Sequence, residues 1–304
     1  MVNTPASAQD TSPAWAYPVN PPDFKLTPDD GAARHVPNST VSLTLTQVRD
    51  RFFAPDWHPE DHPPMPEVVA NGRKPDVSAC GYCHRTDGSG GPENANIAGL
   101  PAEYIVQQMA DFKSGARKSS VQKRAPTELK ASLARAITDD EVKAAATYFA
   151  SIKPRPTIAV VETDMVAKTR VFAWFLAVDP DGGKDPIDQR LVEVADNLEQ
   201  FISRDSRVRF TAFVPKGSIE KGRNIADSAN EAIRCRTCHG SDLKGGGTMP
   251  GIAGRSPTYI FRQLYDYKSG ARAGAGADIM KAIVQKLSAG DMIALAAYAG
   301  SLEP

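Results

Sequence analysis

The sequence has few of the features that mark membrane-spanning, nucleic-acid-binding or disulfide-rich proteins. Its longest apolar run, residues 171–178, is too short to cross a bilayer. Lysine plus arginine number 36 and aspartate plus glutamate also number 36, so the net charge does not favour a nucleic acid partner. There are only five histidines and four cysteines. With 304 residues, 41% of them hydrophobic, the chain is long enough for two globular domains.

The four cysteines form two close pairs, and a histidine follows each pair directly. The motifs are CGYCH, with Cys80, Cys83 and His84, and CRTCH, with Cys235, Cys238 and His239. This spacing is typical of c-type haem attachment, in which two thiols bond the haem and the histidine ligates the iron. A redox dithiol would need a thioredoxin-like context, and a zinc site would use all four cysteines together. The motifs therefore predict two covalently bound haem c groups, here called haem 1 and haem 2.

Covalent haem attachment also predicts where the protein is located. Haem c is attached outside the cytoplasm, so we expect a periplasmic or equivalent extracytoplasmic protein. Residues 3–10, NTPASAQD, have the small side chains of a signal-peptide cleavage region, but no apolar segment precedes them. We therefore expect that the export signal is missing from this sequence.

The sequence around the two motifs is duplicated. At an offset of 155 residues, 80–117 aligns without a gap to 235–272, with 18 of 38 positions identical. Each copy later ends in a helical pattern, at 137–154 and 287–304. Thr138 and Ser288 are the expected N-caps, and Glu141 completes a capping box in the first copy. The duplication predicts two similar helical units.

These motifs resemble those of the dihaem cytochromes c of the cytochrome c-four type, built from two fused class I domains. The resemblance covers about 66–154 and 217–304 and includes IAGLPAEYIVQQMADFKSGAR and its copy IAGRSPTYIFRQLYDYKSGAR. It implies electron transfer, with histidine and methionine as axial ligands of each iron. It also implies that four side chains lie near the haem propionates, namely Tyr104, Arg117, Tyr259 and Arg272.

The expected fold is mainly α, with two class I cytochrome c helical domains in tandem and a small β insertion between them. We expect an extended N-terminal arm with a possible strand at 1–65, a first unit at 66–154, an insertion at 155–216 and a second unit at 217–304. Alternating segments at 169–178, 189–194 and 207–214 predict strands of the insertion, which 39–46 could join. The insertion would either clamp the two units together or dock a redox partner.

The sixth ligand of haem 2 is expected in the loop before the last helix. Met280 fits that position, and its rivals are Met249, in an early loop, and Met292, within the last helix. Histidine with methionine raises the potential of a haem iron and suits reversible one-electron transfer.

Haem 1 departs from this pattern. Alignment of the last helices at an offset of 150 residues places Lys130 opposite Met280, and no methionine lies between 110 and 164. His58 and His62, in the proline-rich segment 56–67, could ligate the iron instead, or that segment could be a stiff surface turn. Met109 and a vacant site are the other possibilities.

The charge pattern and the ligands leave several functions open. Residues 111–135 carry seven basic and two acidic side chains, which could steer an acidic partner, whereas 157–207 carry ten acidic and six basic ones.

The leading hypothesis is an electron carrier between a redox protein donor and acceptor. The alternatives are a dihaem oxidoreductase, peroxidase-like or thiosulfate-dehydrogenase-like, with haem 1 as active centre, and a cytochrome subunit of a dehydrogenase or oxidase complex. We expect no transmembrane segment.

Overall fold

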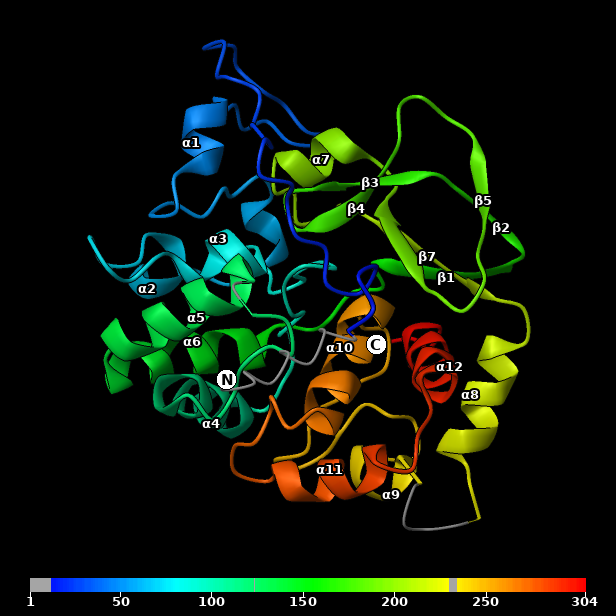
Figure 1. Cartoon of the computed structure of the whole chain (residues 1–304). Helices are drawn as coiled ribbons and strands as arrows, with labels where there is room; N and C mark the ends of the chain where they lie inside the picture. Colours follow the sequence, from blue (N-terminus) through cyan, green and yellow to red (C-terminus); the bar gives the residue numbers. More distant parts are fainter. Residues whose placement is uncertain (1–11, 123, 230–233) are drawn as a thin grey trace, which may run out of the picture.

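The chain is mainly helical, with strands gathered in one part of the molecule (Figure 1). The computed structural model describes residues 12–122, 124–229 and 234–304. The expected signal-cleavage region at 3–10 lies outside these residues. Across the described residues, no helix is long and apolar enough to cross a membrane.

The first unit consists of five helices around an apolar core. They are α2 (Glu67–Ala70), α3 (Cys80–His84), α4 (Ala102–Ser114), α5 (Ala125–Ala136) and α6 (Asp139–Ser151). The core includes Val69, Met109, Tyr148 and Phe149. The expected capping box at the start of α6 is confirmed, since Thr138 accepts from the Glu141 amide and Glu141 accepts from the Thr138 amide.

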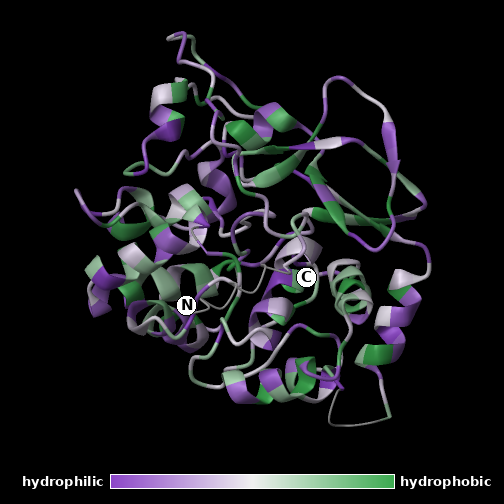
Figure 2. Cartoon of the chain, viewed as in Figure 1, coloured by the Kyte–Doolittle hydropathy of each residue, from purple (hydrophilic) through white to green (hydrophobic). Residues whose placement is uncertain are grey.

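The second unit repeats this order of helices. They are α8 (Ser218–Ala226), α9 (Arg236–His239), α10 (Pro257–Lys268), α11 (Ala277–Val284) and α12 (Ala289–Gly300). Helix α12 is apolar nearly all round (Figure 2), as expected of a buried helix, and Met292 to Gly300 are all buried. Gly222 lets α8 approach α12 closely: a Cβ at that position would lie 2.0 Å from the carbonyl oxygen of Ala294.

The chain between the two units forms strands and one short helix. The elements are β1 (Ile158–Thr163), β2 (Met165–Ala167), β3 (Thr169–Phe172), β4 (Phe175–Val178), β5 (Lys184–Pro186), β6 (Val192–Ala195), α7 (Leu198–Ile202) and β7 (Phe210–Pro215). Strand β7 is central in a three-stranded sheet, parallel to β1 and antiparallel to β6. Phe175, Phe201 and Phe210 pack together between α7 and the strands.

Two expected strands differ from the structure. Residues 169–178 form a tight hairpin rather than one strand, because Ala173 and Trp174 adopt φ values of 45° and 73° between β3 and β4. The segment 39–46 is not a strand of the sheet. Thr44 instead caps the short helix α1 (Leu45–Arg49), where Thr44 and Gln47 form a capping box.

The insertion contacts both units through buried polar groups. Glu193 of β6 accepts hydrogen bonds from the Ser256 hydroxyl (2.8 Å) and the Thr258 amide (2.9 Å) at the start of α10. At the other end, Arg85 donates to the carbonyl oxygen of Asp205 (2.7 Å). These contacts favour the interpretation of the insertion as a clamp.

The N-terminal arm also packs against the second unit. Trp15 lies 4.6 Å from Phe261, measured between ring centroids, and Tyr17 donates a 2.8 Å hydrogen bond to Asp266 of α10. The blue trace in Figure 1 follows this path toward α10. Asp266 also accepts hydrogen bonds from Ser120 of the first unit, so this part of the arm packs where the two units meet.

Candidate functional site

Each cysteine pair lies on a single helical turn that ends in its histidine. In the first unit, His84 Nδ1 donates a hydrogen bond to the carbonyl oxygen of Ala95 (2.8 Å). In the second, His239 Nδ1 donates to the carbonyl oxygen of Pro250 at the same distance. These bonds fix the tautomer, so that Nε2 carries the free lone pair. Burial lowers the pKa of His84 to about 3 and also lowers that of His239, which keeps both rings neutral.

Both motifs open into one cavity. Its volume is about 1010 Å³, and its lining includes both cysteine pairs and both histidines. Much of the wall is apolar, with residues such as Ile97, Met109, Leu264 and Ile283. A large cavity with a partly apolar wall, lined by a histidine and two thiols from each unit, fits two haem groups.

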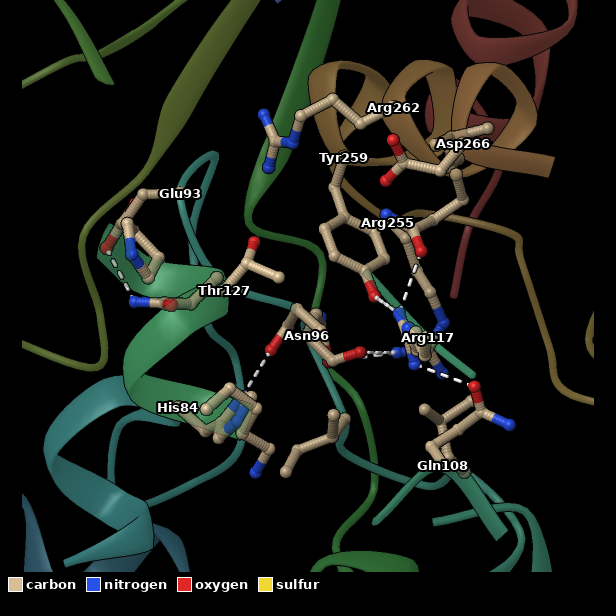
Figure 3. Close-up of a pocket in the computed structure, with 18 of the residues that line it drawn as sticks. His84, Glu93, Asn96, Gln108, Arg117, Thr127, Arg255, Tyr259, Arg262 and Asp266 are labelled. Atoms are coloured by element: carbon tan, nitrogen blue, oxygen red, sulfur yellow. Dashed lines mark hydrogen bonds between the residues drawn. The ribbon is translucent and has the colours of Figure 1, made fainter. Parts of the chain in front are cut away.

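An arginine at the junction reaches from the first unit into the second. Arg117 Nη2 donates to the Tyr259 hydroxyl (2.8 Å) and to Gln263 Oε1 (2.7 Å), while Nη1 donates to Gln108 of its own unit (2.7 Å). Figure 3 shows Arg117 between Tyr259 and Gln108. The second unit thus supplies two hydrogen-bond acceptors to an arginine of the first unit.

Arg272 of the second unit makes the equivalent contacts with the first unit. Arg272 Nη2 donates to the Tyr104 hydroxyl (2.8 Å) and to Gln108 Oε1 (2.7 Å). The two arginines face each other in an antiparallel bridge, flanked by hydrogen bonds from Lys118 N to Ala271 O and from Ala273 N to Ala116 O, both 2.8 Å. The sequence repeat aligns Tyr104 with Tyr259, Gln108 with Gln263 and Arg117 with Arg272. The structure brings both sets together at one junction.

We expect that removing either tyrosine hydroxyl weakens this junction by a similar amount. Tyr104→Phe and Tyr259→Phe each remove one of the acceptors of a buried, charged donor, which should lower the free energy of unfolding by about 1.5–3 kcal/mol. Guanidinium unfolding of the haem-loaded protein measures this loss. Tyr265→Phe, on α10 but outside the network, is the matched control. A loss no larger than that of the control would contradict the prediction.

The cavity wall is strongly basic. Among the described residues, six buried arginines line the cavity but only one buried acid, Asp266; the arginines are Arg85, Arg117, Arg124, Arg255, Arg262 and Arg272. Burying cations in such excess is costly unless anions compensate them. The propionate carboxylates of haem are anions of the required kind, so this observation also fits the implied cofactor.

Three of the basic residues of 111–135 face the interior of the protein. Arg117 and Arg124 are buried, and Lys130 lines the cavity. Ser120, in the same loop, donates from its amide (2.9 Å) and its hydroxyl (2.6 Å) to Asp266. This placement weakens the idea of a basic surface that steers an acidic partner.

Two side chains that the sequence offers as sixth ligands line the cavity, both from helices rather than from a loop. Met280 is on α11 and lines the cavity, packed against the core of the second unit. Lys130 is on α5 and lines the cavity in the first unit, close enough to influence the Cys80 and Cys83 thiols electrostatically. Burial lowers the pKa of Lys130, which favours the neutral amine that a metal ligand requires.

The rival methionines lie in different surroundings. Met249 lines the cavity but is 40% exposed, and Met292 is buried in the core without lining it. Met109 lines the cavity, and so does Leu264, the residue that the 155-residue offset aligns with it in the second unit. Since leucine cannot ligate iron, this equivalence favours a packing role for Met109.

The structure places both histidines of the segment 56–67 away from the cavity. His58 is fully buried, and its Nε2 lies 3.1 Å from Asp205 Oδ1. His62 bonds the Pro63 carbonyl oxygen (2.9 Å) and Asp56 (3.1 Å) through its two ring nitrogens. Both rings are thus held by other partners, which weakens the alternative that they ligate haem 1. The alternative of a stiff surface turn fits only in part, because His58 is fully buried.

Comparison with known proteins agrees with this geometry. A family model described as cytochrome c matches residues 69–153. Cytochrome c-554(548) of Halomonas halodenitrificans is 37% identical over 70 residues, which are 84% of that protein and 23% of this chain. The chain belongs to the cytochrome c family. Covalently bound haem c is therefore its cofactor.

Within the cytochrome c family, the chain resembles the dihaem c4 type. Cytochrome c4 of Azotobacter vinelandii is 26% identical over 228 residues, covering 73% of this chain and 83% of the relative. A thiosulfate dehydrogenase electron acceptor of Thiomonas intermedia is 24% identical over 217 residues, covering 70% and 74%. These relatives support a dihaem electron-transfer cytochrome.

The fold has a counterpart among solved structures. The thiosulfate dehydrogenase TsdBA of Marichromatium purpuratum matches with a TM-score of 0.50 and 22% identity. The match covers 76% of this chain but only 38% of that chain. It shows a shared fold.

Proposed function

We propose that this protein holds two haem c groups in one cavity and passes single electrons between redox proteins in an extracytoplasmic compartment. One observation carries the proposal: two equivalent cysteine and histidine sets open into the same cavity, across a junction made by equivalent arginines. When bound, haem c supplies reversible one-electron chemistry at low-spin iron.

The side chains would each have a defined role in this function. Cys80 and Cys83 would bind haem 1 and Cys235 and Cys238 haem 2, while His84 and His239 would be the proximal ligands. Met280 would complete the ligation of haem 2. Lys130 would complete that of haem 1, since it is the amine on α5 that lines the cavity.

The junction would hold the two cofactors in a fixed relation. Arg117 and Arg272 bond both units at once. Buried, fully bonded groups of this kind restrict motion and help keep water out. The chain would therefore spend little free energy on rearrangement when an electron enters or leaves.

A redox enzyme is the proposed electron donor. The relative in Thiomonas intermedia is named as the electron acceptor of a thiosulfate dehydrogenase, and a relative in Chlorobaculum tepidum as the cytochrome subunit of a sulfide dehydrogenase. We infer a sulfur-oxidising dehydrogenase or a similar complex as donor, with an oxidase or another cytochrome as acceptor.

A dihaem oxidoreductase with haem 1 as active centre is the second candidate. Its support is that Trp174 and Arg204, from the segment between the two units, line the same cavity as Cys83. Described residues offer no cysteine beyond the two pairs for thiolate ligation. Turnover of thiosulfate or hydrogen peroxide by the purified protein would favour this candidate over the carrier.

We expect two covalently bound haems per chain. Both pentapeptides are complete, so haem should remain with the polypeptide through denaturing electrophoresis, and the intact mass should exceed that of the apoprotein by two haem groups. Cys235→Ala with Cys238→Ala is the matched variant and should retain one covalent haem. A wild-type mass with one haem or none would refute the dihaem proposal.

A further inference from the structure

Arg124 has an unusual position at the start of α5. Its side chain lines the cavity and the residue is only 4% exposed. Within the described part of the chain, neither its Nε nor its Nη2 has a hydrogen-bond partner. A buried guanidinium with two unbonded donors costs free energy unless a ligand completes it.

The charged groups around Arg124 leave it without direct compensation. Glu93, Asp266, Arg262 and Tyr17 are the groups that act on it electrostatically. Asp266 Oδ1 already accepts hydrogen bonds from Tyr17 and from Ser120. Glu93 Oε2 is itself without a partner among the described residues. Figure 3 shows Glu93, Arg262 and Asp266 in one close-up of the cavity.

The second unit has no equivalent of Arg124. Alignment of the last helices places Gly274 at the matching position. A Cβ on Gly274 would lie 2.1 Å from the Asp111 carboxylate, so a side chain there would have to displace that carboxylate. The extra cation is therefore a feature of the first unit alone.

We propose that Arg124 binds a propionate carboxylate of haem 1. The proposal rests on the proposed function, since it requires a haem at Cys80 and Cys83. An arginine presents its donors in a planar fork that matches a carboxylate, and such charged pairs are among the stronger hydrogen bonds. We expect the propionate to come from haem 1 rather than haem 2. Arg124 is the N-cap residue of α5, and Lys130, the proposed sixth ligand of haem 1, lies on that helix.

This pairing has a consequence for the redox properties of the first unit. A positive charge close to a haem disfavours the ferric state, which carries one more positive charge than the ferrous state. Arg124 should therefore raise the reduction potential of haem 1 and act much less on haem 2. It would partly offset the low potential that a nitrogen sixth ligand gives.

Redox titration of Arg124→Gln tests the proposal. The glutamine removes the charge but keeps a polar side chain, and we expect the midpoint potential of haem 1 to fall while that of haem 2 moves much less. Arg135→Gln is the matched control, because Arg135 is exposed on the same helix and does not line the cavity. If Arg124→Gln shifts haem 1 no more than this control does, or shifts haem 2 more, the proposal is overturned.

Arg124→Lys keeps the proposal testable if the glutamine variant does not mature. Lysine retains the charge but loses the planar fork, so redox-difference infrared spectra should show shifted propionate carboxylate bands with a potential near the wild type. Unchanged bands would overturn the proposal. Haem content of the wild type is measured first: absence of haem at Cys80 and Cys83 refutes the proposed function, whereas full haem content with unshifted bands refutes only the role of Arg124.

Discussion

Met280→Ala should abolish methionine ligation of haem 2 and leave haem 1 unchanged. Met280 lines the cavity from α11 in the second unit, and loss of its thioether would leave an open axial position. The weak far-red band of iron bonded to methionine sulfur should disappear, and part of the iron should become high-spin. Because axial ligands set haem potentials over about 0.8 V, we expect the potential of haem 2 to fall by on the order of 100 mV.

Met249→Ala is the matched control for this prediction. Met249 lines the same cavity but is 40% exposed, so its removal should preserve the far-red band. If Met280→Ala keeps the band and Met249→Ala loses it, the ligand has been assigned to the wrong methionine. Visible spectra and potentiometric titration of both variants settle the assignment.

Lys130→Ala should convert haem 1 from low-spin to high-spin iron. Lys130 takes the place that Met280 has in the second unit, and burial lowers its pKa, so that the neutral amine can ligate. Without it, haem 1 should bind cyanide rapidly, and its EPR spectrum should change while that of haem 2 stays the same. The low-spin signal of haem 1 should vanish nearly completely.

Three other variants serve as controls for Lys130. Lys143→Ala removes an exposed lysine of α6 that does not line the cavity. His58→Ala and His62→Ala remove the histidines that bond Asp205 and Asp56. All three should keep the low-spin spectrum of haem 1. If Lys130→Ala also keeps it, another group ligates the iron; a wild type that is already high-spin would favour the enzyme hypothesis.

The haem sites could be predicted from the sequence because their chemistry lies in contiguous residues. Each pentapeptide carries three of the groups that a haem needs, and the helix caps at Thr138 and Ser288 were equally local. Self-comparison also found the tyrosines, glutamines and arginines of the junction. It could not show that Arg117 pairs with Tyr259, because that depends on how the two units pack.

Arg124 and the strand boundaries were missed for different reasons. A single arginine in a basic loop carries no pattern, and only its burial beside the cavity distinguishes it. The hairpin turn at Ala173 and Trp174 lies within an apolar run without glycine or asparagine, the residues that usually mark such turns. The helix at Leu45 could have been found, since Thr44 and Gln47 have capping-box spacing.

Low-temperature EPR of the oxidised protein, with spin quantitation against haem content, tests the central claim most directly. We expect two low-spin ferric signals of equal intensity for each polypeptide. One should come from histidine and methionine ligation in the second unit and the other from histidine and lysine ligation in the first. A single low-spin signal per chain, or two identical histidine and methionine signals, would contradict the account.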